Sequence, residues 1–246
     1  MVMKKICLGI IISFGLCNTE VSNLYDKGIN SYKNEQYSNT IKYFNKILEL
    51  NYESEEFYYN LGNSYYLNNN IPLAIWSYEK CLNLNPFNID AKFNLKLSNL
   101  NVKDRIEIPS PPLVLNFFRL IKSILLPSEW IMFWIFLLFI CSISYCLRKI
   151  YFHVFFQKIE LFLYIILFIS ILPGSFSIYD RYTIEEGIIL QSQISVFSAP
   201  NNSSTKLFNI HGGLKVDIRE TDLLWIKIKL IDGKEGWIKS NQILNI

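Results

Sequence analysis

The chain has 246 residues, of which 51% are hydrophobic and 18% are charged, and its formal net charge is +3. Basic residues outnumber acidic ones only in the leader and in residues 109–179, whereas residues 18–108 are slightly acidic and residues 180–246 are neutral. The positive charge therefore accompanies apolar stretches, which excludes a basic face for nucleic acid.

Cysteine and histidine are too scarce to predict a metal site or a disulfide framework. Two of the five cysteines lie in the leader, and Cys141 and Cys146 lie in a long apolar run. This leaves Cys81 as a buried hydrophobe, while His153 and His211 have no partners at zinc-ligand spacing. Paired catalytic carboxylates, Cys–His or Ser–His–Asp arrangements and phosphate loops are also missing from the sequence, so we expect no enzyme activity, no metal and no cofactor.

Residues 1–17 are typical of a secretory signal peptide. A basic head precedes an apolar run over residues 6–16, which is too short to cross a bilayer comfortably. We expect either cleavage before Asn18 or an uncleaved export signal. Lipidation of Cys17 is the alternative, although the bulky Leu16 argues against it. Either interpretation exports the segment that follows.

Residues 21–54 and 55–88 form two units of thirty-four residues with matching chemistry. The matching positions are Leu24 and Tyr58, Gly28 and Gly62, Tyr32 and Tyr66, Thr40 and Ala74, and Phe44 and Tyr78. Residues 89–100 begin a third unit as a lone capping helix. A repeat of this length predicts stacked helix pairs over residues 21–100.

The motif Asn60-Leu61-Gly62-Asn63-Ser64-Tyr65-Tyr66, followed by Ala74, Tyr78 and Asn85-Pro86, resembles the tetratricopeptide repeat. The resemblance implies a concave groove that binds peptide and is lined by the first helix of each pair. The candidate groove residues are Tyr25, Asp26, Ile29, Tyr59, Asn60, Asn63, Tyr66, Phe93 and Asn94. The amides of Asn60 and Asn94 can donate and accept at once, which suits a peptide backbone. The alternative is that the tyrosines serve packing and the asparagines are only solvated.

The next segment is predicted to be a linker followed by a helix at the membrane surface. Residues 101–112 end in Pro109-Ser110-Pro111-Pro112, which predicts a semi-rigid linker. Residues 113–126 are apolar except for polar groups at every third position, including Arg119 and Lys122. This spacing predicts an amphipathic helix along the membrane surface.

Two uncharged runs, residues 130–147 and 161–179, are each long enough for a helix to cross roughly 30 Å of hydrocarbon. The intervening residues 148–160 carry three basic groups and one acidic group, and short basic loops stay cytoplasmic. We therefore expect a transmembrane hairpin in a bacterial inner membrane, with both flanking domains in the periplasm. Neither run contains an ionisable acid, base or histidine, which favours anchors over an ion pathway.

Residues 183–246 predict a small β-barrel. The expected strands are 187–190, 195–198, 207–210, 214–219, 224–231 and 236–238. Apolar and polar residues alternate along Trp225–Leu230, and Asp232-Gly233 is a hairpin signal. Several short strands over about sixty residues favour a closed or half-open barrel.

Ser198-Ala199-Pro200, Gly213 with Val216, Trp225–Ile228 and Asp232–Ile238 resemble a bacterial SH3-like domain. Relatives bind peptides or cell-wall material, and this implies a groove on the barrel. Its candidate residues are Phe197, Phe208, Trp225 and Trp237. The alternative is that these aromatic side chains form the core of the barrel.

The segments together predict a multidomain membrane protein with all-α tetratricopeptide repeats, a two-helix transmembrane hairpin and a C-terminal all-β SH3-like barrel. This order resembles that of a member of the Bat (Bacteroides aerotolerance) family. The resemblance implies a scaffold for protein–protein interactions in envelope or oxidative stress, beside von Willebrand A-domain Bat proteins and a MoxR-type ATPase. The alternative function is an envelope-targeting module whose SH3-like domain binds peptidoglycan or wall peptides. The expected partners are thus proteins, the lipid bilayer and, in the alternative, peptidoglycan, but no nucleic acid.

Overall fold

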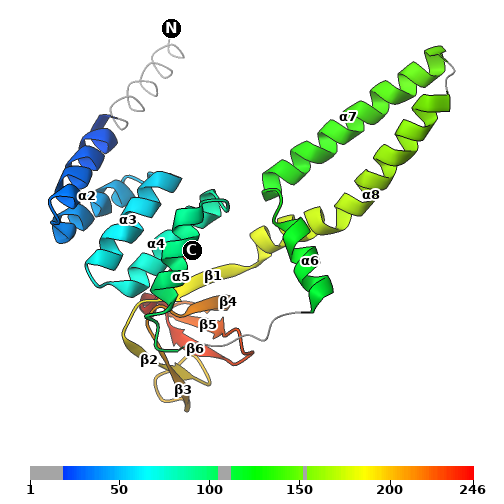
Figure 1. Cartoon of the computed structure of the whole chain (residues 1–246). Helices are drawn as coiled ribbons and strands as arrows, with labels where there is room; N and C mark the ends of the chain where they lie inside the picture. Colours follow the sequence, from blue (N-terminus) through cyan, green and yellow to red (C-terminus); the bar gives the residue numbers. More distant parts are fainter. Residues whose placement is uncertain (1–18, 105–111, 152–153) are drawn as a thin grey trace, which may run out of the picture. The chain divides into compact units, whose positions relative to one another are not determined.

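The computed structural model describes residues 19–104, 112–151 and 154–246, which form two compact units (Figure 1). One unit joins the N-terminal part of the chain to residues 186–246, and the other covers residues 107–185. The predicted signal peptide, most of the predicted linker and two residues of the predicted cytoplasmic loop lie outside the described residues.

The N-terminal part is helical, as predicted. Residues 19–33 form a helix, and α2 (Tyr37–Glu49), α3 (Glu55–Leu67), α4 (Ile71–Leu84) and α5 (Ile89–Asn99) follow it. The side chains of Ser54, Asn70 and Asn88 accept hydrogen bonds from backbone N–H groups three residues further on. These bonds satisfy donors that a helix start leaves free, so they fix where α3, α4 and α5 begin.

Each of the first two helix pairs closes over a glycine. A Cβ atom at Gly28 would lie 2.3 Å from the ring of Phe44, and one at Gly62 would lie 2.6 Å from the ring of Tyr78. Both aromatic side chains are buried. Glycine lets the two helices of a pair approach closely, and the thirty-four-residue spacing produces this contact twice.

The C-terminal part is an antiparallel β-sheet, which agrees with the prediction of β structure there. Its strands are β1 (Glu185–Ile189), β2 (Gln193–Phe197), β3 (Lys206–His211), β4 (Lys215–Asp222), β5 (Trp225–Lys229), β6 (Glu235–Lys239) and β7 (Ile243–Asn245), with a 3-10 turn, η1 (Ser240–Gln242), before β7. The spatial order is β3-β2-β6-β5-β4-β1-β7. The core of the sheet is aliphatic and includes Val196, Ile228 and Ile238, which are all fully buried.

Helices and sheet share a hydrophobic core in this unit. Ile188 of β1 is fully buried in the same apolar cluster as Tyr58 and Trp76. The indole N–H of Trp76 donates a 2.8 Å hydrogen bond to the carbonyl oxygen of Asn245 in β7. The sequence predicts two separate modules and gives no sign of this shared core.

Polar contacts surround the shared core. The Nζ of Lys215 lies 3.0 Å from Glu79 of α4 and 2.8 Å from Glu186 of β1. Asp104 accepts a 2.6 Å hydrogen bond from the backbone N–H of His211, and its carboxylate also lies 2.9 Å from the Nδ1 of the same residue. Polar side chains from before and after the hairpin therefore hold the helices against the sheet.

The second unit contains α6 (Leu113–Lys122), α7 (Pro127–Tyr151) and α8 (Val154–Thr183). Two stretches, Pro127–Ile150 and Phe155–Thr183, are long and apolar enough to cross a membrane by length and composition. The antiparallel helices α7 and α8 pack side by side (Figure 1), and Gly174 sits where a Cβ would lie 2.4 Å from the ring of Trp134. Lys122 of α6 pairs with Asp180 of α8.

The predicted loop 148–160 is mostly helical, because α7 and α8 extend well past the uncharged runs. Arg148 Nη1 and Glu160 Oε2 lie 3.4 Å apart across the two helices. Glu160 is buried, and this ion pair offsets part of the cost of removing its charge from water. Arg148 and Glu160 thus lie within helices, and their ion pair links α7 to α8.

Candidate binding groove

The repeat helices form a groove of about 270 Å³ on one side of the first unit. Its walls come from the helix of residues 19–33 and from α3, α4 and α5. The lining residues are Tyr32, Tyr59, Asn63, Tyr66, Leu67, Tyr78, Asn94 and Leu97. They combine phenol rings, amides and leucines and carry no formal charge, so the groove offers apolar surface and neutral hydrogen-bonding groups.

Asn63 organises the floor of the groove. Its Oδ1 accepts a 2.7 Å hydrogen bond from the hydroxyl of Tyr78 and a 2.8 Å bond from the Nδ2 of Asn94. One carbonyl oxygen therefore joins α3 to both α4 and α5. An amide nitrogen carries two hydrogens, so this bond occupies only half of the donor capacity of Asn94.

A second polar link joins the first two repeats. The hydroxyl of Tyr25 donates a 2.7 Å hydrogen bond to Glu56 Oε1 and accepts a 2.7 Å bond from Asn60 Nδ2. Because Asn60 already donates to Tyr25, this amide contributes first to holding adjacent repeats together.

Two phenols of the groove, those of Tyr32 and Tyr78, have a pKa above the ordinary value of a tyrosine. Burial raises the pKa of Tyr32, and it also raises the pKa of Tyr78 far above the ordinary value of 10.0. Desolvation disfavours the charged phenolate. Neutral hydroxyl groups can donate and accept, so the groove retains both capacities over the whole pH range of a living cell.

The structure brings part of the predicted peptide site together. Tyr59, Asn63, Tyr66 and Asn94 line the groove. The other predicted residues lie elsewhere on the repeats: Tyr25 and Asn60 form the inter-repeat link, Ile29 packs against the helical core, and Asp26 and Phe93 are exposed.

Four lining residues were missed by the sequence analysis: Tyr32, Leu67, Tyr78 and Leu97. Tyr32 occupies the same repeat position as Tyr66, so applying the repeat pattern evenly would have found it. Leu97 follows in the same way, because it lies thirty-four residues after Asn63. Leu67 directly follows Tyr66, at a position that the same repeat pattern includes, whereas Tyr78 carries no such signal for the groove.

The aromatic residues predicted to line a groove on the sheet divide into two groups. Phe197, Trp225 and Trp237 are half-buried and alternate along their strands with the aliphatic core residues, so they lie on the other face of the sheet. Phe197 pairs in register with Trp237, and its ring centroid lies 5.6 Å from that of Trp225. Phe208 instead packs against the aliphatic core.

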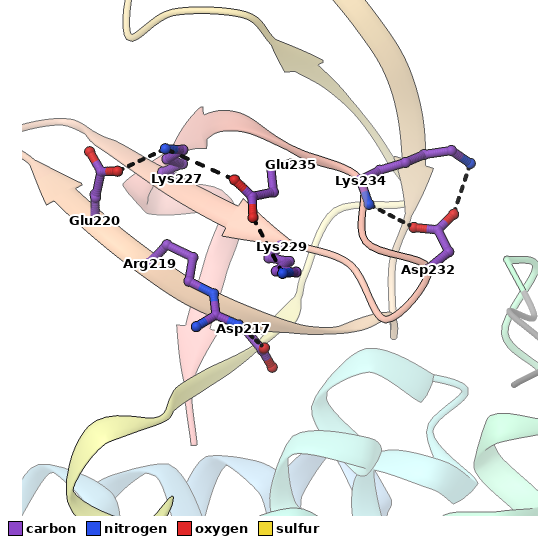
Figure 2. Close-up of polar contacts among 8 residues, drawn as sticks. All are labelled: Asp217, Arg219, Glu220, Lys227, Lys229, Asp232, Lys234 and Glu235. Atoms are coloured by element: carbon purple, nitrogen blue, oxygen red, sulfur yellow. Dashed lines mark hydrogen bonds and ion pairs between the residues drawn. The ribbon is translucent and has the colours of Figure 1, made fainter. Parts of the chain in front are cut away.

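Charges around these strands compensate one another (Figure 2). Lys227 lies 2.8 Å from Glu220 and 4.0 Å from Glu235. Two further pairs, Arg219 with Asp217 and Lys234 with Asp232, each have a 2.8 Å contact. This surface therefore has no strong excess of either sign to attract a charged polymer.

The described part of the chain contains no cluster of three or more His, Cys, Asp or Glu side chains able to hold a metal ion. No family model matches the chain, and no curated protein matches it in sequence. The groove chemistry and the two long apolar helices are thus the observations on which a functional proposal has to rest.

Replacing Tyr78 by Phe tests whether the raised pKa of this phenol makes the stability of the fold depend on pH. A group whose pKa is raised in the folded state stabilises the fold below its unfolded pKa, here 10.0, and this stability is lost as the pH rises further. The wild type should therefore lose stability above about pH 10, and Tyr78→Phe should reduce that slope by up to about 1.4 kcal/mol per pH unit. Denaturant titrations of the purified chain at pH 7 to 11 measure the free energy of unfolding, and its change with pH gives the slope. Tyr182→Phe, at a position that is 80% exposed, is the control and should leave the slope unchanged.

Proposed function

We propose that this chain is a membrane-anchored scaffold that holds a segment of another protein in the groove between its repeats. The observation that carries the proposal is the uncharged groove, in which tyrosine and asparagine side chains converge from several helices. An extended peptide presents alternating N–H and C=O groups, and neutral amides and phenols can pair with both. The tetratricopeptide-like repeats would supply the groove, and the SH3-like sheet would stiffen it through the shared core.

The proposed location is the outer face of a bacterial inner membrane. The two apolar helices fit a two-span anchor, and Arg148, Lys149 and Lys158 lie near their junction. Basic residues beside a short connection favour the cytoplasmic side. The core shared by residues from before and after the hairpin supports placing the helical and sheet parts on the same side of the bilayer.

The proposed setting is an envelope or oxidative-stress complex of the Bat type, with von Willebrand A-domain proteins as the partners. This part rests on the order of segments along the chain. The groove adds one restriction on the partner. A charged side chain inside it would lose hydration without meeting an opposite charge among the lining residues, so a neutral segment is favoured.

A second candidate function is wall binding by the sheet. Phe197, Trp225 and Trp237 present a contiguous half-buried aromatic surface, and ring contacts of this kind suit sugars or peptide stems. In this alternative the repeats are mainly structural.

A reporter tests the orientation. Alkaline phosphatase fused after Ile246 should be active, because the account places that end outside the cytoplasm. A fluorescent protein that folds only in the cytosol should stay dark at the same position. A reversed pattern contradicts the proposed orientation, and the same pair of fusions after Lys149 should give the opposite result.

Variants in the groove test whether the chain holds a protein segment there. A photoreactive amino acid at Leu67, which lines the groove and is 45% exposed, captures bound protein in intact cells. Combining Tyr66→Ser with Asn94→Ala should lower the yield of the adduct about tenfold or more, because central aromatic and hydrogen-bonding contacts carry most of the binding energy.

Two control variants separate the candidate functions. Lys42→Ala, an exposed position on α2, should leave the adduct unchanged. Trp225→Ser with Trp237→Ser should also leave it unchanged but would abolish binding to isolated sacculi if the sheet is the functional site. The scaffold proposal is contradicted if the groove variants leave the adduct unchanged. If sacculus binding also depends on the tryptophans, wall binding by the sheet is the better account.

A further inference from the structure

The hairpin between β4 and β5 ends in two exposed leucines. Asp222 pairs with Trp225, so Leu223 and Leu224 alone form the turn. Leu223 is 92% exposed and Leu224 is 73% exposed, and Leu223 is the most exposed large hydrophobic side chain among the described residues. Two-residue hairpin turns normally use Asn, Gly or Asp, so leucine at both positions is unusual.

Leu223 also adopts a strained backbone conformation. Its φ angle is +48°, in the left-handed region that disfavours residues with a bulky side chain. Asn or Gly would fit this turn better and would be more soluble. The two leucines therefore contribute little to folding, which points to a contact made by their side chains.

The turn projects from the end of the sheet at which the chain arrives from α8. Ile189 bonds to Gly213 and Leu214, whereas Glu186 reaches Lys215, so β1 and β4 run in opposite directions. The start of β1 consequently lies beside the middle of β4, and β4 continues past it to Asp222. About five residues at 3.3 Å each extend the turn roughly 15 Å beyond that point.

The covalent connection to the membrane is very short. The apolar helix α8 ends at Thr183, and β1 begins at Glu185. The sheet is thus tethered within a few residues of a helix suited to span a bilayer. Such a tether gives the turn a high effective concentration at the lipid surface, so even a small apolar contact can be well populated.

The residues near the turn suit a bilayer interface. Trp225 follows the leucines directly, and tryptophan is enriched at the boundary between lipid and water. Glu220 is paired with Lys227, and Asp217 is paired with Arg219. The charges closest to the leucines are Asp222, which precedes Leu223, and Lys239, which pairs in register with Trp225. Because these two charges have opposite signs, the contact would depend on apolar insertion rather than on anionic lipid.

We propose that Leu223 and Leu224 insert into the surface of the membrane in which the chain is anchored, and so steady the first unit against the bilayer. A bilayer fits better than a protein partner, because a specific protein interface buries at least about 1,000 Å², far more than a two-residue turn supplies. Insertion of the leucines adds to the tether and does not depend on the ligand of the groove.

Photo-crosslinking of the full chain in phosphatidylcholine nanodiscs tests the proposal. A benzophenone amino acid replaces Leu224 in one variant and Ile231 in the other. Ile231 is 61% exposed and follows β5 at its opposite end, which makes it a matched control. The probe at 224 should form a lipid adduct about tenfold more often than the probe at 231, and high salt should not lower the yield.

A Leu223→Asn substitution beside the probe at 224 separates insertion from folding. Asparagine tolerates the left-handed conformation, so the unfolding temperature should rise by a few degrees or stay unchanged. The lipid adduct should nevertheless fall several-fold, because the apolar side chain is gone. Equal lipid adducts at 224 and 231, an adduct with protein or with a second copy of the chain in place of lipid, or no effect of Leu223→Asn would each overturn the proposal.

Discussion

Ile188 lies far from the repeats in the sequence, yet its side chain is fully buried among the aromatic residues of α3 and α4. Burying an isoleucine contributes about 1.5–3 kcal/mol, and the hydrogen bond from Trp76 to Asn245 and the contacts of Lys215 add to it. This packing unites a helical part and a β part that could each have been a separate module. The orientation of the hairpin and the rigidity of the groove both depend on it.

The hairpin of α7 and α8 lowers the entropic cost of forming a core between residues far apart in the sequence. About eighty residues separate Asp104 from Glu186, and closing a flexible loop of that length would carry a substantial entropic cost. Within the second unit, antiparallel packing of α7 against α8 folds most of this segment into a hairpin, and the pairs Arg148–Glu160 and Lys122–Asp180 fasten it.

The helices and strands were predicted well, because the patterns that indicate them depend on residues close together in the sequence. The recurrence of Gly28 with Phe44 and of Gly62 with Tyr78 reports helix pairs, and alternation from Trp225 to Leu230 reports a strand. The shared core could not be predicted in full. Ile188 lies in the uninterrupted apolar run Gly187-Ile188-Ile189-Leu190, which indicates a strand buried on both faces but does not identify what covers it. Residues 148–160 were predicted to be a loop because they are charged. Hydropathy indicates which residues can lie in lipid, but it does not indicate where a helix ends.

The groove was predicted in part for a similar reason. Repeat positions identify the residues on the first helices, such as Tyr59 and Asn63, but Tyr78 reaches the groove from a second helix. The turn at Leu223 shows the reverse case, in which the sequence departs from what folding favours. Departures of this kind mark places where side chains serve contacts outside the fold.

Native-state hydrogen exchange on an Ile188→Ala variant of the full chain in nanodiscs tests the shared core most directly. If helices and sheet form one core, removing this buried side chain should lower the protection of amides in α4 as well as in β1, by an amount of about 2–5 kcal/mol. Ile231→Ser, at an exposed site, should change neither. Loss of protection confined to the strands, with α4 unaffected, would contradict the account and leave two independent modules.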